Sequence, residues 1–283
     1  MKTAIILGTF DGLHAGHRAV IEKAQGFYSV AVTFDRPPKS FLTRDPQLLM
    51  LSEDRINRLK ELGIDKVEMQ SFEAVKDIDA KKYLEHLKQN YNPNRIVCGF
   101  NYRFGAGAAG DTALIAEFCK KNGIEFICVP PVEKDGIILS STYIRNLIRE
   151  GNMAKAVSQI YGGFAFTAPV LHGDARGRQL GFPTANQEYP NDLVKLKFGV
   201  YISRVVVDGK QYRAITNIGI RPTYQTDTIG CETFIKNFSG DIYGKQMTTE
   251  LLHFVREEQK FSAIDELKNA ILNDVKLLDY IGG

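Results

Sequence analysis

The first 130 residues alternate short apolar runs with segments of helical periodicity, and this alternation constrains the fold more than any other feature of the sequence. The runs are rich in Ile, Val and Phe and are bounded by Gly, Asp or Pro, which is typical of strands. The predicted strands are 4–7, 29–34, 66–70, 95–98 and 125–129. Strands that alternate with helices at this spacing predict a parallel, doubly wound α/β sheet.

Helix candidates lie between and after these strands. The predicted helices are 53–62, 80–89, 112–122, 141–149 and 153–159. Ser52, Asp79 and Asp111 stand where an N-cap is expected, and Gly63 and Gly123 stand where a helix should end.

The sequence changes character after a turn predicted at 134–136 and the last two of these helices. From about residue 162 it consists of strands separated by turns, which favours an antiparallel β-barrel or sandwich. The clearest strands are 164–171, 200–207, 211–218 and 231–236, and a closing amphipathic helix follows the apolar spacing Ile264, Leu267, Ile271, Val275, Leu278. We therefore predict an α/β domain over 1–159 and a β-barrel domain over 160–283.

Composition narrows the classes of function. A net charge of +3 on 283 residues requires neither nucleic acid nor a membrane, although it suits a protein that handles phosphorylated anions. The four cysteines form no CxxC pair, so we expect buried, reduced thiols. The apolar run at the N-terminus enters a Gly/Asp turn, which indicates a strand rather than a signal peptide. We expect a cytoplasmic protein; its oligomeric state is open.

The sharpest functional signal is GTFDGLHAGH at residues 8–17. A turn through Gly8, Thr9 and Phe10 follows the first strand, and a helix should begin near residue 16, which creates an anion site for ATP. His14 and His17 are three residues apart, so both can face the α-phosphate and stabilise its charge. Two surface histidines, or half of a metal site, are the alternatives, but a zinc site needs more ligands.

A second candidate phosphate-binding segment lies at 139–145. Ser141 and Thr142 begin a predicted helix, where hydroxyl and N–H groups can hold phosphate. Arg145, one turn later, could clamp the β- and γ-phosphates. By itself the segment could equally be a plain helix cap.

The second half has no P-loop but contains HGDARGRQLGFPTAN at 172–186. Gly173, Arg178 and Gly181 belong to a basic, glycine-rich loop suited to ATP. Thr184 and Asn186 alternate along an extended segment, so their oxygens can share a face and bind Mg²⁺. An ordinary Gly/Pro turn is the alternative.

The segment 105–110 reads GxGxxG but follows the fourth predicted strand and opens no helix. This position argues against an NAD-binding fingerprint. We interpret the segment as a flexible loop that covers flavin or nucleotide.

The first half resembles the nucleotidylyltransferase superfamily, whose HxGH and ISSTxxR motifs match GTFDGLHAGH and SSTYIR. Within it, the chain resembles the N-terminal domain of prokaryotic bifunctional riboflavin kinase/FMN adenylyltransferase, also called FAD synthetase. Two further segments match that family, VTFDRPP (32–38) and CGFNYRFGAGAAGD (98–111). The first matches only in part, because Arg36-Pro37 replaces the family's Pro-His. In the second, Tyr102 stands where Phe is usual. The resemblance implies a Rossmann-like domain with flavin contacts from Asp35, Asn101 and Arg103.

The second half resembles the riboflavin kinase domain over its full length. RGRQLGFPTAN is the most specific segment, and it is followed in order by KFGVY, NIGIRPT, CETFI, DIYGK and REEQKF. The resemblance implies Mg²⁺–ATP binding by Thr184 and Asn186 and a general base at Glu232, which could otherwise be a solvent-facing strand residue. Arg256 could contact a phosphate or the flavin, or pair only with Glu257 or Glu258.

Together the resemblances imply two uses of ATP: riboflavin is phosphorylated to FMN, and FMN is adenylylated to FAD with release of pyrophosphate. Both steps are expected to need Mg²⁺. Two alternatives stay open. One domain alone could be active, the kinase being the better matched, or the chain could be a non-catalytic flavin-binding regulator. A pantetheine- or glycerol-phosphate nucleotidylyltransferase would share HxGH but would leave residues 162–283 unexplained.

Overall fold

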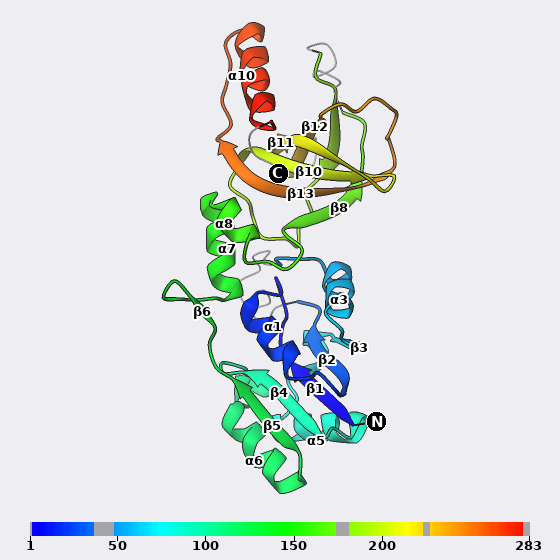
Figure 1. Cartoon of the computed structure of the whole chain (residues 1–283), viewed down its shortest axis with the longest axis vertical. Coiled ribbons are helices and arrows are strands. Elements are labelled where there is room, and N and C mark those ends of the chain that lie inside the picture. The colour runs from blue at the N-terminus through cyan, green and yellow to red at the C-terminus, as the bar shows by residue number, and fades with distance from the viewer. Residues whose placement is uncertain (1, 37–47, 174–180, 223–226, 280–283) are drawn as a thin grey trace. The chain divides into compact units, whose positions relative to one another are not determined.

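The computed structural model describes residues 2–36, 48–173, 181–222 and 227–279 (Figure 1). It divides into two compact units, Met1–Ile144 and Arg145–Gly283, which are described separately below. The division falls inside helix α7 (Ser141–Glu150). A domain boundary at 159–160 stays a prediction.

The first unit contains one five-stranded parallel sheet. Its strands are β1 (Thr3–Leu7), β2 (Tyr28–Phe34), β3 (Lys66–Gln70), β4 (Arg95–Gly99) and β5 (Glu125–Val129). They lie in the order β3-β2-β1-β4-β5, and every pair is parallel, which confirms the doubly wound sheet. The order reverses between β1 and β4, and in such sheets the crevice at the carboxyl ends of the two diverging strands is the usual place for a ligand.

The helices of this unit begin largely where the sequence predicts. They are α1 (Ala15–Glu22), α3 (Ser52–Glu61), α4 (Phe72–Val75), α5 (Ala80–Tyr91) and α6 (Thr112–Asn122). The carboxylates of Asp79 and Asp111 accept backbone N–H groups in the first turns of α5 and α6, which confirms both caps. Ser52 as an N-cap is wrong: the helix starts at Ser52 itself, and its hydroxyl donates to the carbonyl of Asp35, so a tertiary contact replaces the cap.

One face of the sheet is covered by α5 and α6. Alternate residues of the central strands, Ile5 and Leu7 among them, form an apolar cluster with Tyr83 and Leu84 of α5 and Ile115 of α6. This cluster fixes the sheet beneath the loops at its carboxyl edge.

Two of the three glycines in the GxGxxG segment are closely packed. It contains a short 3₁₀ helix, η1 (Ala106–Ala108), and Phe104 and Gly110 pair as an antiparallel bridge. A Cβ on Gly105 would lie 2.7 Å from the Cα of Ala80, and one on Gly110 would lie 2.6 Å from the Phe104 ring. Gly105 and Gly110 therefore allow close packing, whereas a Cβ on Gly107 would meet nothing within 4 Å. That this loop is flexible and covers a ligand stays a prediction.

A small hairpin follows β5. It pairs β6 (Glu133–Lys134) with β7 (Ile137–Ile138), and its tip residues Asp135 and Gly136 both have positive φ. This arrangement confirms the predicted turn.

The second unit is built on an antiparallel sheet. Its strands are β8 (Ala165–Pro169), β9 (Thr184–Glu188), β10 (Gly199–Val207), β11 (Lys210–Pro222), β12 (Asp227–Ile235) and β13 (Gln246–Arg256), in the order β8-β13-β10-β11-β12-β9. An antiparallel bridge between Leu171, just after β8, and Asn186 of β9 brings the two edges of the curved sheet together (Figure 1). The unit is thus the predicted β-barrel type, with helices α8 (Met153–Val157) and α10 (Ile264–Leu277) outside the sheet.

The two faces of this sheet carry different side chains. Val205, Val207, Ala214 and Met247 belong to an apolar cluster on the inner face. A chain of buried hydroxyls runs across the same face: Ser203 bonds Thr216 at 2.7 Å, and Thr216 bonds Thr233 at 3.0 Å. On the opposite face Val200, Ile202 and Ile215 pack against Leu278 at the end of α10.

Three of the four cysteines are buried, namely Cys98, Cys119 and Cys231, whereas Cys128 is exposed on β5. The prediction of buried thiols is therefore wrong for Cys128, because alternate side chains of a strand point to opposite faces. Within the described ranges no helix is both long and apolar enough to cross a bilayer.

Two candidate active sites

The first candidate site is the turn that joins β1 to α1 at the point where the strand order reverses. His14 is the N-cap residue of α1, and its ring stacks on that of His17 with centroids 3.8 Å apart. Phe10 meets His17 edge-on at 5.5 Å. A Cβ on Gly16 would lie 3.1 Å from the His14 ring, so a larger residue there would crowd the imidazole. The sequence thus places two imidazoles beside the positive end of a helix, which favours an anion.

The turn itself is strained. Phe10 and Leu13 have φ of 50° and 43°, values that non-glycine residues rarely adopt. Gly12 has φ of 86°, and a Cβ there would lie 2.7 Å from Leu49. A strained backbone of this kind persists only where the surrounding structure holds it.

Asp11 holds the turn from one side. It is fully buried, and its Oδ1 accepts the backbone N–H groups of Leu49 at 2.8 Å and Met50 at 3.3 Å. The carbonyl of Asp11 accepts the hydroxyl of Ser141 at 2.8 Å. The structure therefore brings the start of α7 to the turn, as expected if both bind one nucleotide.

The other residues predicted for this site lie around the same edge. Gly8 and Thr9 follow β1 directly, and Thr142 is exposed beside Ser141. Arg145 lies one turn further along α7 and is the first residue of the second unit.

The three residues predicted to contact flavin follow strand ends. Asp35 comes directly after β2, and its Oδ1 accepts the N–H groups of Arg36 and Phe72. Asn101 is exposed shortly after β4. Arg103 is exposed and pairs with Asp111 at 3.3 Å. The carboxyl ends of β1, β2 and β4 share one edge of the sheet, so all three lie on the side of the histidines.

The second candidate site is a row of polar side chains across three strands of the barrel unit. Glu232 of β12 pairs directly with Asn186 of β9 on one side and with Asn217 of β11 on the other. Residues that are paired in this way point to the same face, with Cβ atoms about 5 Å apart. The Glu232 residue is exposed to solvent. The flanking sequence alone could not fix this face.

A cavity of about 670 Å³ adjoins one end of this row. Thr184, Asn186, His172, Asp241 and Tyr243 are among its lining residues. The rings of His172 and Tyr243 stack at 4.0 Å, and Asp241 accepts the N–H of Tyr243 at 3.0 Å. A cavity of this size is large enough for a small organic ligand.

Two of the predicted loop glycines have identifiable roles. A Cβ on Gly173 would lie 2.2 Å from the amide nitrogen of Asn186, so only glycine fits there. Gly181 has φ of 84°, a conformation that favours glycine. Arg178 lies outside the described residues.

Arg256, at the end of β13, pairs with Asp274 of α10. Its Nη2 lies 2.7 Å from Oδ2 and its Nε 3.2 Å from Oδ1, and Nη1 donates to the carbonyl of Glu257. Glu258, two residues further along the chain, accepts the side-chain amide of Asn217 at 3.2 Å. The segment after β13 is thereby tied both to α10 and to the polar row.

Comparisons with known proteins match each half of the chain to a family. A riboflavin kinase family model matches residues 162–281, and an FAD synthetase family model matches residues 1–143. A bifunctional riboflavin kinase/FMN adenylyltransferase from Pseudomonas fluorescens is 31% identical over 280 residues, which cover 95% of this chain and 89% of the relative. The chain belongs to the family of bifunctional riboflavin kinase/FMN adenylyltransferases.

Other members and neighbours differ in length or in name. The trifunctional protein RibF/MnmA of Mycoplasmoides gallisepticum is 33% identical, but this chain spans only 39% of it. A crystal structure described as a macrolide-efflux protein from Streptococcus pneumoniae superposes on this chain with a TM-score of 0.90 at 28% sequence identity. The superposition covers 99% of this chain and 95% of that protein's chain. That agreement extends over both units of the riboflavin kinase/FMN adenylyltransferase fold.

Sequence reasoning missed several residues of this riboflavin kinase/FMN adenylyltransferase. Asn217 pairs with Glu232 and is bonded by Glu258, and His172, Asp241 and Tyr243 line the cavity, yet the sequence does not single out any of them. Four of these residues belong to the motifs NIGIRPT, REEQKF and DIYGK, so the motifs were the signal that could have identified them. Only the strand register and the tertiary contacts show which residues of these motifs lie together.

Proposed function

We propose that this chain catalyses two ATP-dependent transfers. The first phosphorylates riboflavin to FMN and releases ADP, and the second adenylylates FMN to FAD and releases pyrophosphate. The observation that carries the proposal is the strand register that sets Glu232 directly between Asn186 and Asn217, beside the cavity lined by Thr184. A non-catalytic flavin binder would have no use for a carboxylate in that place.

In the kinase step Glu232 acts as the general base. Its exposed carboxylate orients the primary 5′-hydroxyl of riboflavin and accepts the proton late in the transfer. A bond forms between that oxygen and the γ-phosphorus while the bond to the β–γ bridging oxygen breaks, and ADP leaves. Asn217, held by Glu258, flanks the carboxylate and limits its position.

The donor set of the cavity fits Mg²⁺. Thr184 and Asn186 supply a hydroxyl and an amide oxygen, and Asp241 adds a carboxylate to the lining of the same cavity. Hard oxygen donors are what Mg²⁺ prefers beside substrate phosphates, whose negative charge it neutralises when bound. We propose these residues, with Gly173, Gly181 and Arg178, as the ATP site of the kinase.

In the adenylyl transfer a phosphate oxygen of FMN attacks the α-phosphorus of ATP, and pyrophosphate leaves. His14 and His17, with the N–H groups at the start of α1, donate to the phosphate oxygens as charge shifts onto them. Ser141, Thr142 and Arg145 are proposed to hold the leaving phosphates. Positioning and electrostatics suffice, so neither transfer needs a covalent enzyme intermediate.

The remaining assignments concern flavin. We propose that Asp35, Asn101 and Arg103 contact FMN at the first site, and that Arg256 contacts riboflavin at the second. The four free cysteines accord with a reducing compartment, for which we propose the cytoplasm.

Two variants of the full chain test the division of chemistry. Glu232→Gln should lower riboflavin phosphorylation by about 10²–10⁴-fold and leave FMN adenylylation unchanged. His17→Ala should lower FMN adenylylation by roughly 10²–10³-fold and leave the kinase rate unchanged. Each step is measured by chromatography of the flavins, with riboflavin or FMN as the starting substrate.

Each variant serves as the folding control for the other, because each keeps one activity. Loss of both activities in either variant, or retention of kinase activity in Glu232→Gln, would contradict the assignment.

A further inference from the structure

A fully buried arginine lies beneath the first candidate site. Arg55 on α3 is 0% exposed and is the largest of the fully buried side chains in the described part of the molecule. Arginine is almost never buried in this way unless its guanidinium is well bonded. Burial lowers the pKa of Arg55 from its ordinary value, while the nearby carboxylates of Asp11 and Asp35 raise it.

The shortest hydrogen bonds of Arg55 go to backbone carbonyls of two separate segments, and its Nη2 also lies 3.4 Å from Oγ of Ser52 and 3.5 Å from Sδ of Met69. Its Nη1 donates to the carbonyl of Thr9 at 3.1 Å, in the turn after β1. Its Nη2 donates to the carbonyls of Phe34 at 2.7 Å and Asp35 at 3.1 Å, at the end of β2. One rigid, planar group therefore spans the two loops at the edge of the sheet where the substrates are expected.

The contact to Thr9 falls at the most constrained point of the turn. The carbonyl of Thr9 also accepts the hydroxyl of Thr33 at 2.9 Å, and the next residue, Phe10, has the positive φ described above. The ring of Phe10 in turn packs on His17. A change in the orientation of the Thr9 peptide would thus be passed to Phe10 and through it to the imidazole.

We infer that Arg55 is a positioning residue for adenylyl transfer: it fixes the strained turn that carries His14 and His17 and ties it to the segment Phe34–Asp35. It acts through the backbone and touches no reacting atom. The inference rests on the adenylyltransferase activity proposed above.

The distinguishing variant is Arg55→Lys. Lysine keeps a cation that can reach part of the same space, but its ammonium is a point donor and cannot span two loops as the planar fork does. The turn should therefore loosen while the unit stays folded. Arg55→Met would leave three carbonyls without this donor and could unfold the unit, so it is the less informative change.

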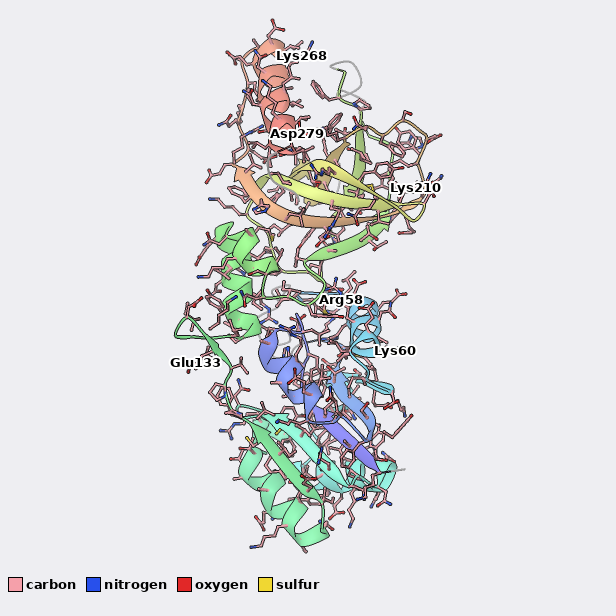
Figure 2. All side chains as sticks on the ribbon, viewed as in Figure 1. Arg58, Lys60, Glu133, Lys210, Lys268 and Asp279 are labelled. Atoms are coloured by element: carbon pink, nitrogen blue, oxygen red, sulfur yellow. The ribbon has the colours of Figure 1, made fainter. Side chains whose placement is uncertain are left out.

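Two matched controls lie on the same helix. Leu59→Ala removes a fully buried apolar side chain from α3 and lowers stability, but it removes no side-chain hydrogen bond to the carbonyls of Thr9 or Phe34. Lys60→Gln alters an exposed residue, which Figure 2 labels on this helix together with Arg58. A merely structural role for Arg55 predicts that Arg55→Lys behaves like Leu59→Ala.

The experiment measures kcat and KM for FMN and ATP in the adenylyl transfer, at a temperature where circular dichroism shows all variants folded. Arg55→Lys should lower kcat on the order of 10²-fold, as expected for a misplacement of about 1 Å. The controls should keep the kcat of the unaltered chain. The riboflavin kinase rate of the same samples should not change.

Hydrogen–deuterium exchange of the peptide that contains residues 8–17 gives a second readout. It should quicken in Arg55→Lys and not in Leu59→Ala. If the kcat of Arg55→Lys falls no further than that of Leu59→Ala, or if exchange is the same in both, the inference is overturned. If the unaltered chain makes no FAD from FMN, the proposed function fails, and the exchange comparison still decides whether Arg55 holds the turn.

Discussion

The ion pair between Arg256 and Asp274 should make a large contribution to the free energy that holds α10 against the barrel. The Asp274 side chain is only 8% exposed and the Arg256 side chain 22%, and two hydrogen bonds join them. We predict that Asp274→Ala destabilises the second unit well beyond the loss of an ordinary surface contact.

The magnitude follows from the burial of the two groups. Unit charges about 4 Å apart attract by roughly 4 kcal/mol at an effective dielectric constant of about 20. Breaking a buried pair by removing one partner costs about 3–5 kcal/mol, because the other charge is left behind. Arg256 keeps some contact with water, so we expect the lower end, about 3 kcal/mol.

A matched control lies at the end of the same helix. Asp279, labelled in Figure 2, pairs with Lys236, but its side chain is 60% exposed. Asp279→Ala should therefore cost less than about 1 kcal/mol. Urea unfolding of the full chain, followed by circular dichroism, measures both as a shift of the midpoint at constant slope.

The same variant has a functional consequence. Without Asp274 the guanidinium of Arg256 loses its fixed orientation, so the KM for riboflavin should rise in Asp274→Ala and not in Asp279→Ala. If Asp274→Ala loses no more stability than Asp279→Ala, the pair contributes nothing net, and apolar contacts alone hold α10.

Three further predictions concern other parts of the molecule. Burial raises the pKa of the Cys98 thiol to about 12. In the native protein a thiol reagent should therefore modify the exposed Cys128 quickly and Cys98 only on unfolding, and rapid modification of both thiols would contradict the burial of Cys98. Gly173→Ala should abolish kinase activity, because its Cβ would collide with Asn186, and leave FMN adenylylation intact; an active kinase would show that the loop can shift. Thr216→Val should cost about 1–3 kcal/mol in urea unfolding, because two neighbouring buried hydroxyls lose their partner, and an unchanged midpoint would refute this.

The sequence predicted the sheet of the first unit closely because its central strands, β1, β2 and β4, are buried apolar runs and its edge strands are bounded by clear turn residues. The predicted strands 66–70 and 125–129 coincide with β3 and β5, and the helix at 112–122 coincides with α6. Local signals decide such elements: an apolar run ends at a turn, and a cap residue precedes a helix. Short elements such as α4 and η1 carry too little periodicity to be predicted.

Tertiary contacts explain the errors. Ser52 looks like a cap, but its hydroxyl is used by Asp35 from a distant loop. Arg55 lies in the charged segment SEDRINRLKE, which gives no hint that its side chain is buried.

The candidate sites divide in the same way. His14 and His17 are close in sequence, so their pairing could be predicted. Asn217 and Glu258 are 41 residues apart and meet only through the register of the barrel. Register depends on long-range pairing, which a single sequence does not specify.

The central claim is that one chain performs both transfers, and one incubation tests it most directly. The purified full chain is mixed with riboflavin, ATP and Mg²⁺, and the flavins are separated by chromatography over time. FMN should appear first and FAD should follow, and a chelator of Mg²⁺ should prevent the formation of both. FMN without FAD would reduce the claim to the kinase alone, and the absence of any product would contradict it.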